Sequence, residues 1–533
     1  MLSLFRHWKS RSKKTSPKST QKKHAEEPSS IRCFVASIPE DALAMIFDFV
    51  FTALCAEFDS ETSPDHPPAL SIMKLSHVNQ RFRLVSLSYP HLWTHISSTL
   101  KQPEMGLVKA CLERSRDLPV TVHLTIYLCG AYYPFCDDVT AAARKCAHRW
   151  RSVHIHFAYI HCTPLNASEL SVDPTRGTEE MRDISAPALE YLRLISEGSS
   201  LDEELLFLET WNVPRLHGLT TVHSFPSKLS SFMAITSLDM KLGLFRTGQS
   251  NDFLDLIRSS KIPNLTDLSI TIDHDERFWR RDIGIGIEPP YPITPIPSIQ
   301  RLRITTSIGA HRNLYGEGRE RDLFHALSFP NARDLSVTFE GEHQHVRDPM
   351  PHFYLSHIAE RIFITDDVRP ADWDPKYRQF PRVDRLVINI SSSGLEPDKF
   401  AGEVASFLLP LHIFPSLKDL CVRANIPVDP YTHMLHYGRY EQPALRHIEF
   451  DISRVASPFA TASPFPLRPE HWEWFCAVAD KLMARGVWHE FEKLTLIERV
   501  FETNPDGTVV TKSNVKSEFL RDMLFKDADS GGF

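Results

Sequence analysis

The sequence lacks several features that would place the chain in common functional classes. Its longest apolar run, Ala42 to Ala56, spans about 15 residues and carries Asp48, whereas a bilayer-spanning helix needs about 20. The nine cysteines form no C-x-x-C pair and we see no secretory leader, which favours a reducing compartment, cytoplasmic and/or nuclear. The net charge of -7 gives no overall bias toward nucleic acid or membranes.

Motifs of catalysis and cofactor binding are also missing. The chain has no G-x-S-x-G, H-E-x-x-H or Walker A motif, and its I-G-I-G-I run at 283–287 lacks the spacing of a dinucleotide-binding loop. His154 and His156 could share one face of a strand near His161 and Cys162, but no second cluster of ligands follows at metal spacing. We therefore predict a non-catalytic protein with no cofactor and no metal.

Glycine is sparse, with 20 residues against 38 prolines, which indicates stiff connections between elements. Residues 1–30 are rich in Ser and Lys and poor in apolar residues, so we predict a disordered basic tail. Such a tail is compatible with a nuclear signal, or with a mitochondrial presequence because the first 24 residues contain no acid. The weak amphipathic pattern favours a simple solvated segment.

The first folded element is predicted to be a helix over residues 37–54. Ser37 and Glu40 form an S-x-x-E capping box, and Pro39 falls in the first turn, where its missing N–H costs little. An apolar stripe at helical spacing follows, made of Leu43, Ile46, Phe47, Val50, Phe51 and Leu54.

A second helix is predicted from Lys74 to Tyr89. Its apolar stripe consists of Leu75, Val78, Phe82, Val85 and Tyr89. Pro90 ends the helix, and Trp93 can fold back as an apolar plug. The acidic, Pro-rich segment EFDSETSPDHPPA before this helix predicts a surface loop.

From about residue 115 an internal repeat appears, apolar-x-x-apolar-x-apolar, usually preceded by Pro. Clear copies lie at 186–194, 262–272, 296–306, 329–339, 380–390, 414–424 and 442–452; weaker copies lie at 149–157, 233–242, 357–365 and 491–498. Each unit has room for a short strand and a return segment, and the returns at 251–262 and 403–414 look helical. Because one unit cannot bury its apolar face alone, we predict stacked units forming a parallel sheet.

Side chains alternate along a strand, so every second residue of a copy points to the core. The expected core column is Leu268, Leu302, Leu335, Ile362, Leu386, Leu420 and Ile448. Residues that alternate with this column face outward, and stacked repeats usually bind partners on such a face. The candidate substrate-binding residues there are Arg303, Phe363, Asn389, Arg423, Glu449 and Asp451.

The repeat resembles the leucine-rich repeat, whose L-x-x-L-x-L-x-x-N pattern is fullest at Leu417, Leu420, Val422 and Asn425. The other copies mostly lack the Asn, so we expect an irregular, divergent solenoid. The alternative is a generic α/β sheet whose strands look alike, but the recurring Pro before each copy favours a repeat.

The segment from Ile38 to Trp93 resembles an F-box. The family pattern is matched at Ile38-Pro39-Glu40, Leu43, Ile46-Phe47, Leu75, Val78, Arg81-Phe82-Arg83 and Leu92-Trp93. Departures are Ile38 for the usual Leu, Asn79 for a small residue, and the long acidic loop. The continuation through Leu112-Glu113-Arg114-Ser115 and Leu118-Pro119-Val120 is similar to F-box proteins abundant in mushroom-forming fungi.

The resemblance implies a mixed α/β fold (α+β overall). It has an N-terminal three-helix F-box, followed by an irregular leucine-rich-repeat-like solenoid with a parallel sheet. The expected layout is a tail at 1–30, an F-box at 31–97, a linking helical and strand segment at 98–148, a solenoid at 149–500, and a hairpin or helix cap with a tail at 501–533.

The function implied by the resemblance is that of a substrate receptor in an SCF-type ubiquitin ligase. The F-box would bind the linker subunit, and through it a cullin, while the repeats hold an unknown protein substrate. The residues expected to divide between the F-box core and the linker interface are Ile38, Pro39, Leu43, Ile46, Phe47, Leu75, Val78, Phe82 and Trp93. Since small domains bury little surface alone, sharing an apolar face with a partner is physically reasonable.

Two other functions were weighed. A repeat scaffold with a degenerate F-box and no role in ubiquitination would have the same overall sequence pattern. DNA binding by the helix at 74–89 is disfavoured by the acidic net charge and by about 14 residues between the helices, where a helix-turn-helix has a turn of 3–4. No nucleic acid or membrane partner is therefore expected.

Overall fold

The computed structural model describes most of the chain between residues 38 and 520. The described residues are 38–60, 67–97, 105–127, 134–158, 178, 180–196, 204–243, 247–259, 261–273, 293–308, 323–324, 326–342, 362–363, 378–393, 405–407, 409, 411–424, 428–430, 442–455, 469–503 and 509–520. The basic tail at 1–30, Ser37 and Asn425 lie outside these ranges, as do the I-G-I-G-I run, His161 and Cys162.

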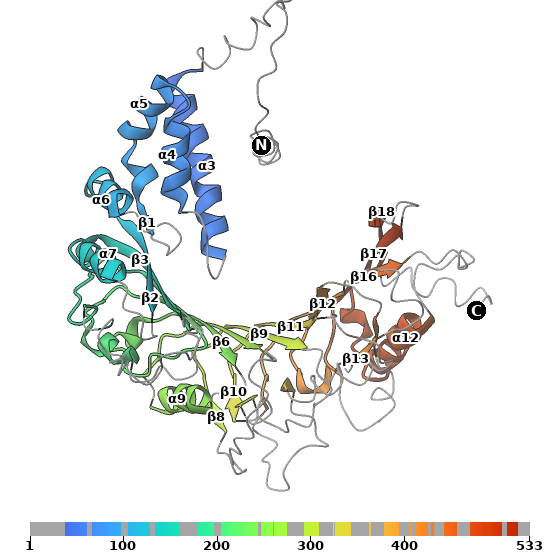
Figure 1. Ribbon diagram of the computed structural model, residues 1–533. Helices are drawn as coiled ribbons and strands as arrows, with labels where there is room; N and C mark the ends of the chain where they lie inside the picture. Colours follow the sequence, from blue (N-terminus) through green and yellow to red (C-terminus); the bar gives the residue numbers. More distant parts are fainter. Residues whose placement is uncertain are drawn as a thin grey trace, which may run out of the picture.

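Three helices and a 3-10 turn form the N-terminal end of the molecule (Figure 1): α3 (Glu40–Ser60), α4 (Pro68–Ser76), α5 (Gln80–Ser88) and η1 (Pro90–Trp93). Helix α3 runs six residues beyond the predicted end at residue 54, so the start of the expected acidic loop is helical. Pro67 is the N-cap of α4 and Pro68 is its first residue, which agrees with the tolerance of proline at the first helical position.

The single helix predicted from Lys74 to Tyr89 is wrong, because the chain breaks at residues 77–79. Asn79 has an extended backbone (φ -160°, ψ 171°), and its side chain accepts a hydrogen bond from the Phe82 N–H at 2.8 Å. This is an N-cap, which satisfies one of the free N–H groups at the start of a new helix. The apolar spacing runs across the break and therefore conceals it.

We expect Asn79→Ala to lower the free energy of unfolding by ~1 kcal/mol, because the Phe82 N–H loses its acceptor. Asn79→Asp keeps an oxygen at the same place and should stay close to wild type. Guanidinium unfolding followed by far-UV circular dichroism measures both variants. Equal stability of Asn79→Ala and wild type would contradict this role of the cap.

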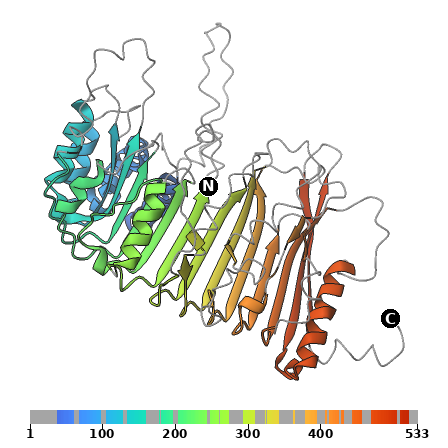
Figure 2. The same ribbon diagram turned by 90° about the horizontal axis from the view of Figure 1, so that it is seen from below.

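The rest of the described chain is built on one 14-stranded sheet whose strands lie side by side in chain order (Figure 2). Every neighbouring pair is parallel except the last, which is antiparallel. The strands are β1 (His95–Ser97), β2 (Val120–Tyr127), β3 (Trp150–Ala158), β4 (Tyr191–Ser196), β5 (Gly218–Val222), β6 (Ser237–Gly243), β7 (Asp267–Asp273), β9 (Arg301–Ile308), β11 (Asp334–Glu342), β12 (Arg385–Ser393), β14 (Asp419–Ala424), β16 (His447–Val455), β17 (Lys493–Thr503) and β18 (Val509–Leu520).

The sheet is curved, and its return segments lie on the convex side (Figure 1). Those segments include α7 (Pro134–Arg144), α9 (Thr247–Arg258) and α12 (Pro469–Ala484), while α6 (Met105–Arg114) lies beside the N-terminal helices. Two small sheets pair β8 (Thr294–Pro295) with β10 (Leu327–Ser328) and β13 (Ala405–Phe407) with β15 (Val428–Pro430). Shorter turns are η2 (Ala147–Arg149), η4 (Glu204–Thr210), η5 (Phe232–Ala234), η9 (Leu411–Ile413) and η11 (Trp488–Glu490). The chain is thus mixed α/β with a large, mostly parallel sheet.

The predicted helix at 251–262 is confirmed by α9, but the predicted helix at 403–414 is wrong. That return contains the short strand β13 and the turn η9. Pro410 in this segment can neither donate the backbone hydrogen bond of a helix nor fit its interior.

A column of buried aliphatic side chains crosses the whole parallel sheet and forms the core. The predicted members Leu268, Leu302, Leu335, Leu386, Leu420 and Ile448 are in register. Register also brings in Ile96, Val122, Val153, Leu192, Leu219, Leu238 and Leu494, and all of them are buried.

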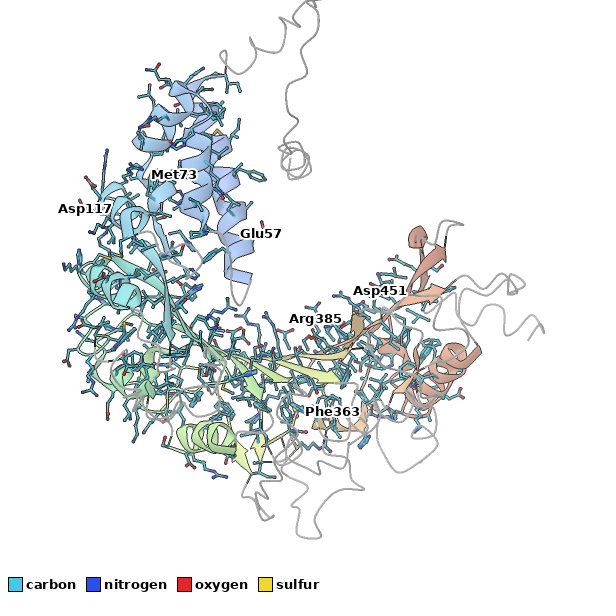
Figure 3. All side chains as sticks on the ribbon, viewed as in Figure 1. Glu57, Met73, Asp117, Phe363, Arg385 and Asp451 are labelled. Carbon is cyan, nitrogen blue, oxygen red and sulfur yellow. The ribbon has the colours of Figure 1, made fainter. Side chains whose placement is uncertain are left out.

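The prediction for Ile362 is wrong, because β11 pairs directly with β12 and residues 362–363 lie outside the sheet. Ile362 and Phe363 are still buried, in the layer under the strands. The ring of Phe363 packs on Phe414 and Phe380, with centroids 5.6 and 6.2 Å apart. Figure 3 shows Phe363 on the convex side, away from Arg385 and Asp451.

The sheet begins earlier than the expected layout. Strand β1 starts at His95, inside the segment assigned to the F-box, and β2 lies in the segment assigned to a linker. At the other end, β17 and β18 pair antiparallel, and β17 begins at Lys493, inside the segment assigned to the solenoid. The N-terminal helices therefore continue directly into the first unit of the sheet. None of the helices in the described ranges combines the length and apolarity needed to cross a bilayer.

Candidate functional site

The N-terminal helices pack around a small aromatic core. The Phe47 and Phe82 rings meet edge to face, with centroids 5.3 Å apart. Trp93 is fully buried; its indole N–H donates to the Ser86 carbonyl oxygen at 2.8 Å, and the Arg114 guanidinium lies 4.4 Å from its ring centroid. Trp93 therefore links α5 with α6, two residues before the sheet begins at His95.

The nine candidate linker-binding residues divide by exposure. Leu43, Phe47 and Trp93 are buried and belong to the core side of the expected division, so they present no surface to a partner. Ile38, Leu75 and Phe82 are half-buried against that core. Pro39, Ile46 and Val78 are exposed.

The most exposed apolar side chains of this end were missed. Met45 and Phe49 are 73% and 68% exposed, and their spacing of four residues places them on one face of α3. On α5, Leu84 is 59% exposed and Leu87 is exposed as well. The sequence contains the signal: the run ALAMIFDFVF is apolar on more faces of a helix than one core can cover.

The spacing argument against DNA binding does not hold, because α4 and α5 are separated by only three residues, 77–79. The exposed surface of this pair is nevertheless unsuited to phosphates. It presents Val78, Leu84 and Leu87 together with the exposed Lys74 and Arg83, so its basic side chains are interspersed with apolar ones, whereas nucleic-acid binding needs a clustered basic patch.

On the concave face of the sheet, three of the candidate substrate-binding residues, Asn389, Arg423 and Asp451, lie in one row across the strands. Thr305, Thr338, Asn389, Arg423 and Asp451 occupy matched positions on successive strands. The Asn389 amide donates to the Thr338 hydroxyl at 3.2 Å. Figure 3 shows Arg385 and Asp451 on this inner side.

Two of the six candidate substrate-binding residues need correction. Phe363 belongs to the buried layer under the sheet, and Asp451 is 6% exposed although it lies on the concave side. Arg303 is exposed, while Arg423 and Glu449 form an ion pair at 3.5 Å. Arg303, Asn389, Arg423 and Glu449 therefore remain available at the surface.

Cys421 is paired in register with Glu449, and its thiol is expected to react slowly. Its thiol donates to Glu449 Oε1 at 3.2 Å, and burial, together with this carboxylate, raises the pKa of Cys421 from 9.0 to about 12. Because the thiolate is the nucleophile, iodoacetamide at pH 8 should modify Cys421 at least ~100-fold more slowly in native protein than after unfolding. Peptide mass spectrometry measures the rates, and equal rates in the two states would contradict this environment.

Acidic and basic residues alternate at the first positions of successive strands. This ladder of charges was not predicted. Asp267, Arg301, Asp334, Arg385, Asp419 and His447 occupy matched positions on six strands. Arg301 forms an ion pair with Asp267, which raises the pKa of the guanidinium. His447 lies 2.6 Å from Asp419 and 3.0 Å from Glu492. The signal is visible in the sequence, because each residue directly precedes the core Leu or Ile of its copy.

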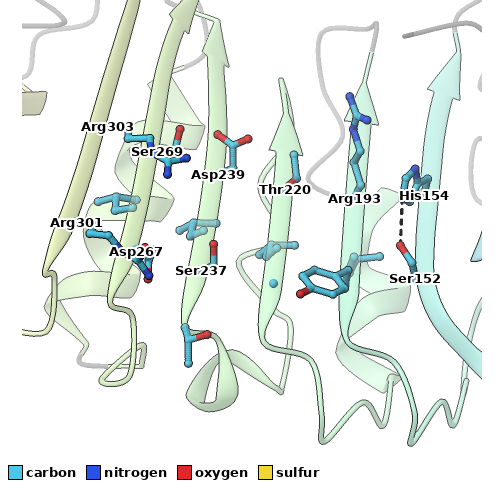
Figure 4. Close-up of a pocket in the computed structure, with 17 residues that line it drawn as sticks. Ser152, His154, Arg193, Thr220, Ser237, Asp239, Asp267, Ser269, Arg301 and Arg303 are labelled. Atoms are coloured by element: carbon cyan, nitrogen blue, oxygen red, sulfur yellow. Dashed lines mark hydrogen bonds and ion pairs between the residues drawn. The ribbon is translucent and has the colours of Figure 1, made fainter. Parts of the chain in front are cut away.

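A pocket of about 730 Å³ lies on the concave face over β3 to β9 (Figure 4). Its polar lining includes the hydrogen-bonded pair Ser152 and His154, 3.1 Å apart. One edge is apolar: the Tyr191 ring lies against the backbone of Gly218, where any larger residue would collide with it. The remaining charged lining residues are Arg193, Asp239, Asp267, Arg301 and Arg303.

No protein-family model matches this chain, and a search of curated proteins finds no match either. The functional argument therefore rests on the geometry of the two surfaces and on the sequence motifs.

The histidines near the pocket contact one another through their rings. The His95 and His123 rings stack with centroids 4.4 Å apart, the His154 ring lies tilted against His123 at 4.0 Å, and Phe58 of α3 meets the His95 ring edge to face. Across the described ranges, no three His, Cys, Asp or Glu side chains are placed to hold a metal ion. The described residues offer two surfaces for a partner: an apolar face on the helices and a mixed-charge pocket on the sheet.

Proposed function

We propose that this protein is the substrate-recognition subunit of an SCF-type ubiquitin ligase. In this proposal α3, α4 and α5 form an F-box that binds the linker subunit, and through it a cullin. The parallel sheet with its return segments forms a divergent leucine-rich-repeat-like solenoid that holds a protein substrate. The protein itself catalyses no reaction.

The observation that supports this proposal most directly is the apolar face of α3. Large apolar side chains that remain this exposed on a folded protein are typical of protein–protein interfaces. Met45, Ile46 and Phe49 all lie on that face. They follow the Ile38-Pro39-Glu40 motif of the resemblance, whose Glu40 is the first residue of α3, and in this proposal the linker subunit binds there.

The arrangement of the two surfaces fits an adaptor. Strand β1 begins two residues after Trp93, so the helices and the curved sheet share one core with no flexible linker between them. A rigid connection of this kind holds a bound substrate at a fixed position relative to the ligase. It thereby raises the effective concentration of the substrate near the ubiquitin-charged enzyme.

Co-purification of the full-length chain with an SCF linker subunit tests the proposal. We expect a stable complex by size-exclusion chromatography, together with recovery of the cullin from cell extract. A folded chain that never binds the linker subunit would contradict the proposal and favour the alternative, a repeat scaffold with a degenerate F-box.

A further inference from the structure

The polar side chains of the pocket form one row across six strands. His154, Arg193, Thr220, Asp239, Ser269 and Arg303 occupy matched register positions on β3, β4, β5, β6, β7 and β9. Figure 4 shows them side by side on the open face of the sheet. A ligand lying across the strands would therefore contact these side chains one after another, in a fixed order.

The charges in this row differ from those in the ladder beside it. Arg301 and Asp267 neutralise each other through their ion pair. Asp239 and Arg303 are both exposed, and within the described residues neither forms a hydrogen bond or an ion pair. From β4 to β9 the row therefore consists of a cation (Arg193), a hydroxyl (Thr220), a carboxylate (Asp239), a hydroxyl (Ser269) and a cation (Arg303).

The spacing of the row matches an extended polypeptide. Neighbouring strands lie about 4.8 Å apart, so charges two strands apart are separated by about 10 Å. An extended chain in the polyproline II conformation has three residues per turn and advances about 3.1 Å per residue, so side chains three residues apart share one face and cover nearly the same distance. Thr220 and Ser269 fall between the charges, where their hydroxyls can bond the backbone of such a chain.

We propose that the pocket binds an extended segment of the substrate protein with the pattern acid-x-x-base-x-x-acid, laid across the strands. The outer acids pair with Arg193 and Arg303, and the central base pairs with Asp239. The Tyr191 ring at the apolar edge packs against a spacer side chain. This inference rests on the proposed function only in taking the segment to belong to a protein presented to the ligase.

The central carboxylate decides the class of ligand. A nucleic acid strand or a polyphosphate would place negative charge against Asp239, and like charges facing each other across an interface are strongly unfavourable. A segment of alternating charge satisfies all three positions. The chemistry of the row thus favours a mixed-charge peptide over a simple polyanion.

The test uses the full-length chain and fluorescein-labelled synthetic peptides, with fluorescence anisotropy as the readout. One peptide carries Glu-x-x-Lys-x-x-Glu with Ser and Ala spacers, and a control has the same composition with its charges clustered. A third peptide spaces the charges seven residues apart, as a helix would need. We expect the first to bind about tenfold more tightly than either of the others.

Charge reversal at Asp239 gives the sharper result. We expect Asp239→Lys to weaken binding of Glu-x-x-Lys-x-x-Glu about tenfold and to strengthen binding of Glu-x-x-Glu-x-x-Glu. Glu340→Lys is the matched control. Glu340 is exposed on β11, which lies three strands from the strand of Asp239, β6, and it does not line the pocket. Reversed preference in Asp239→Lys alone supports the proposal.

The proposal is overturned if the three peptides bind equally, if the helix-spaced peptide binds best, or if Asp239→Lys leaves the preference unchanged. Binding to the linker subunit is measured on the same samples. Loss of peptide preference with intact linker binding rejects the pocket alone. Peptide preference without linker binding rejects the ubiquitin ligase role and leaves a peptide-binding protein.

Discussion

Replacing both Met45 and Phe49 with aspartate is expected to abolish binding to the SCF linker subunit while leaving the fold intact. Both side chains are more than two-thirds exposed, so their loss removes little packing within the chain. At the centre of an interface, large apolar side chains are each worth about 2 kcal/mol or more, and a buried unpaired charge adds to the loss. The affinity should therefore fall by at least ~100-fold.

Surface plasmon resonance with immobilised linker subunit measures this loss, and thermal unfolding checks the fold. The matched control is Met233→Asp with Leu206→Asp, which places the same charges at exposed apolar positions of the sheet region. Leu43 is unsuitable for this test because it is buried, and its substitution would lower binding by unfolding the helices. Unchanged binding by the Met45 and Phe49 double variant would remove α3 as the linker-binding face.

The core of the sheet was predictable because the pattern that defines it is local. Each clear copy places an aliphatic residue at the same offset after Pro, and parallel pairing then sets the register of Leu302 on Leu335. The predicted column did not extend to β1 and β2 because these strands carry no such copy: Ile96 and Val122 join the column only through pairing. Ile362 is an error of the opposite kind: its segment matches the pattern but does not form a strand of the sheet. Its apolar side chain is buried in the layer beneath the strands instead.

The candidate sites were predicted less well, for a physical reason. Apolar spacing indicates which residues share a helix face, but it does not say whether that face meets the core or solvent. Leu43 and Met45 lie two residues apart in one apolar run, and one is buried while the other is exposed. On the sheet, the row from Arg193 to Asp239 needed the register of β5, which matches no copy, and of β6, whose copy at 233–242 is weak in sequence.

Replacing Trp93 with alanine is expected to be among the most destabilising single changes in the chain. Trp93 is fully buried and links α5 with α6 through its hydrogen bond to Ser86 and its contact with Arg114, two residues before the first strand begins. Truncating a buried aromatic residue costs about 3–5 kcal/mol. Trp93→Phe keeps most of the volume but leaves the Ser86 carbonyl without its donor, which costs about 1–3 kcal/mol.

Guanidinium unfolding followed by tryptophan fluorescence and circular dichroism measures both Trp93 variants, with Trp474→Ala as the matched control. Trp474 is equally buried, against Phe450 at the opposite end of the sheet. Both alanine variants should lose stability, but only Trp93→Ala should also lose linker binding, because in an array of stacked units each unit contacts only its neighbours. If Trp474→Ala abolished linker binding as well, the sheet would unfold as one cooperative body, and the helices could not be treated as a separable interface. If Trp93→Ala were as stable as wild type, Trp93 would have no part in holding the helices to the sheet.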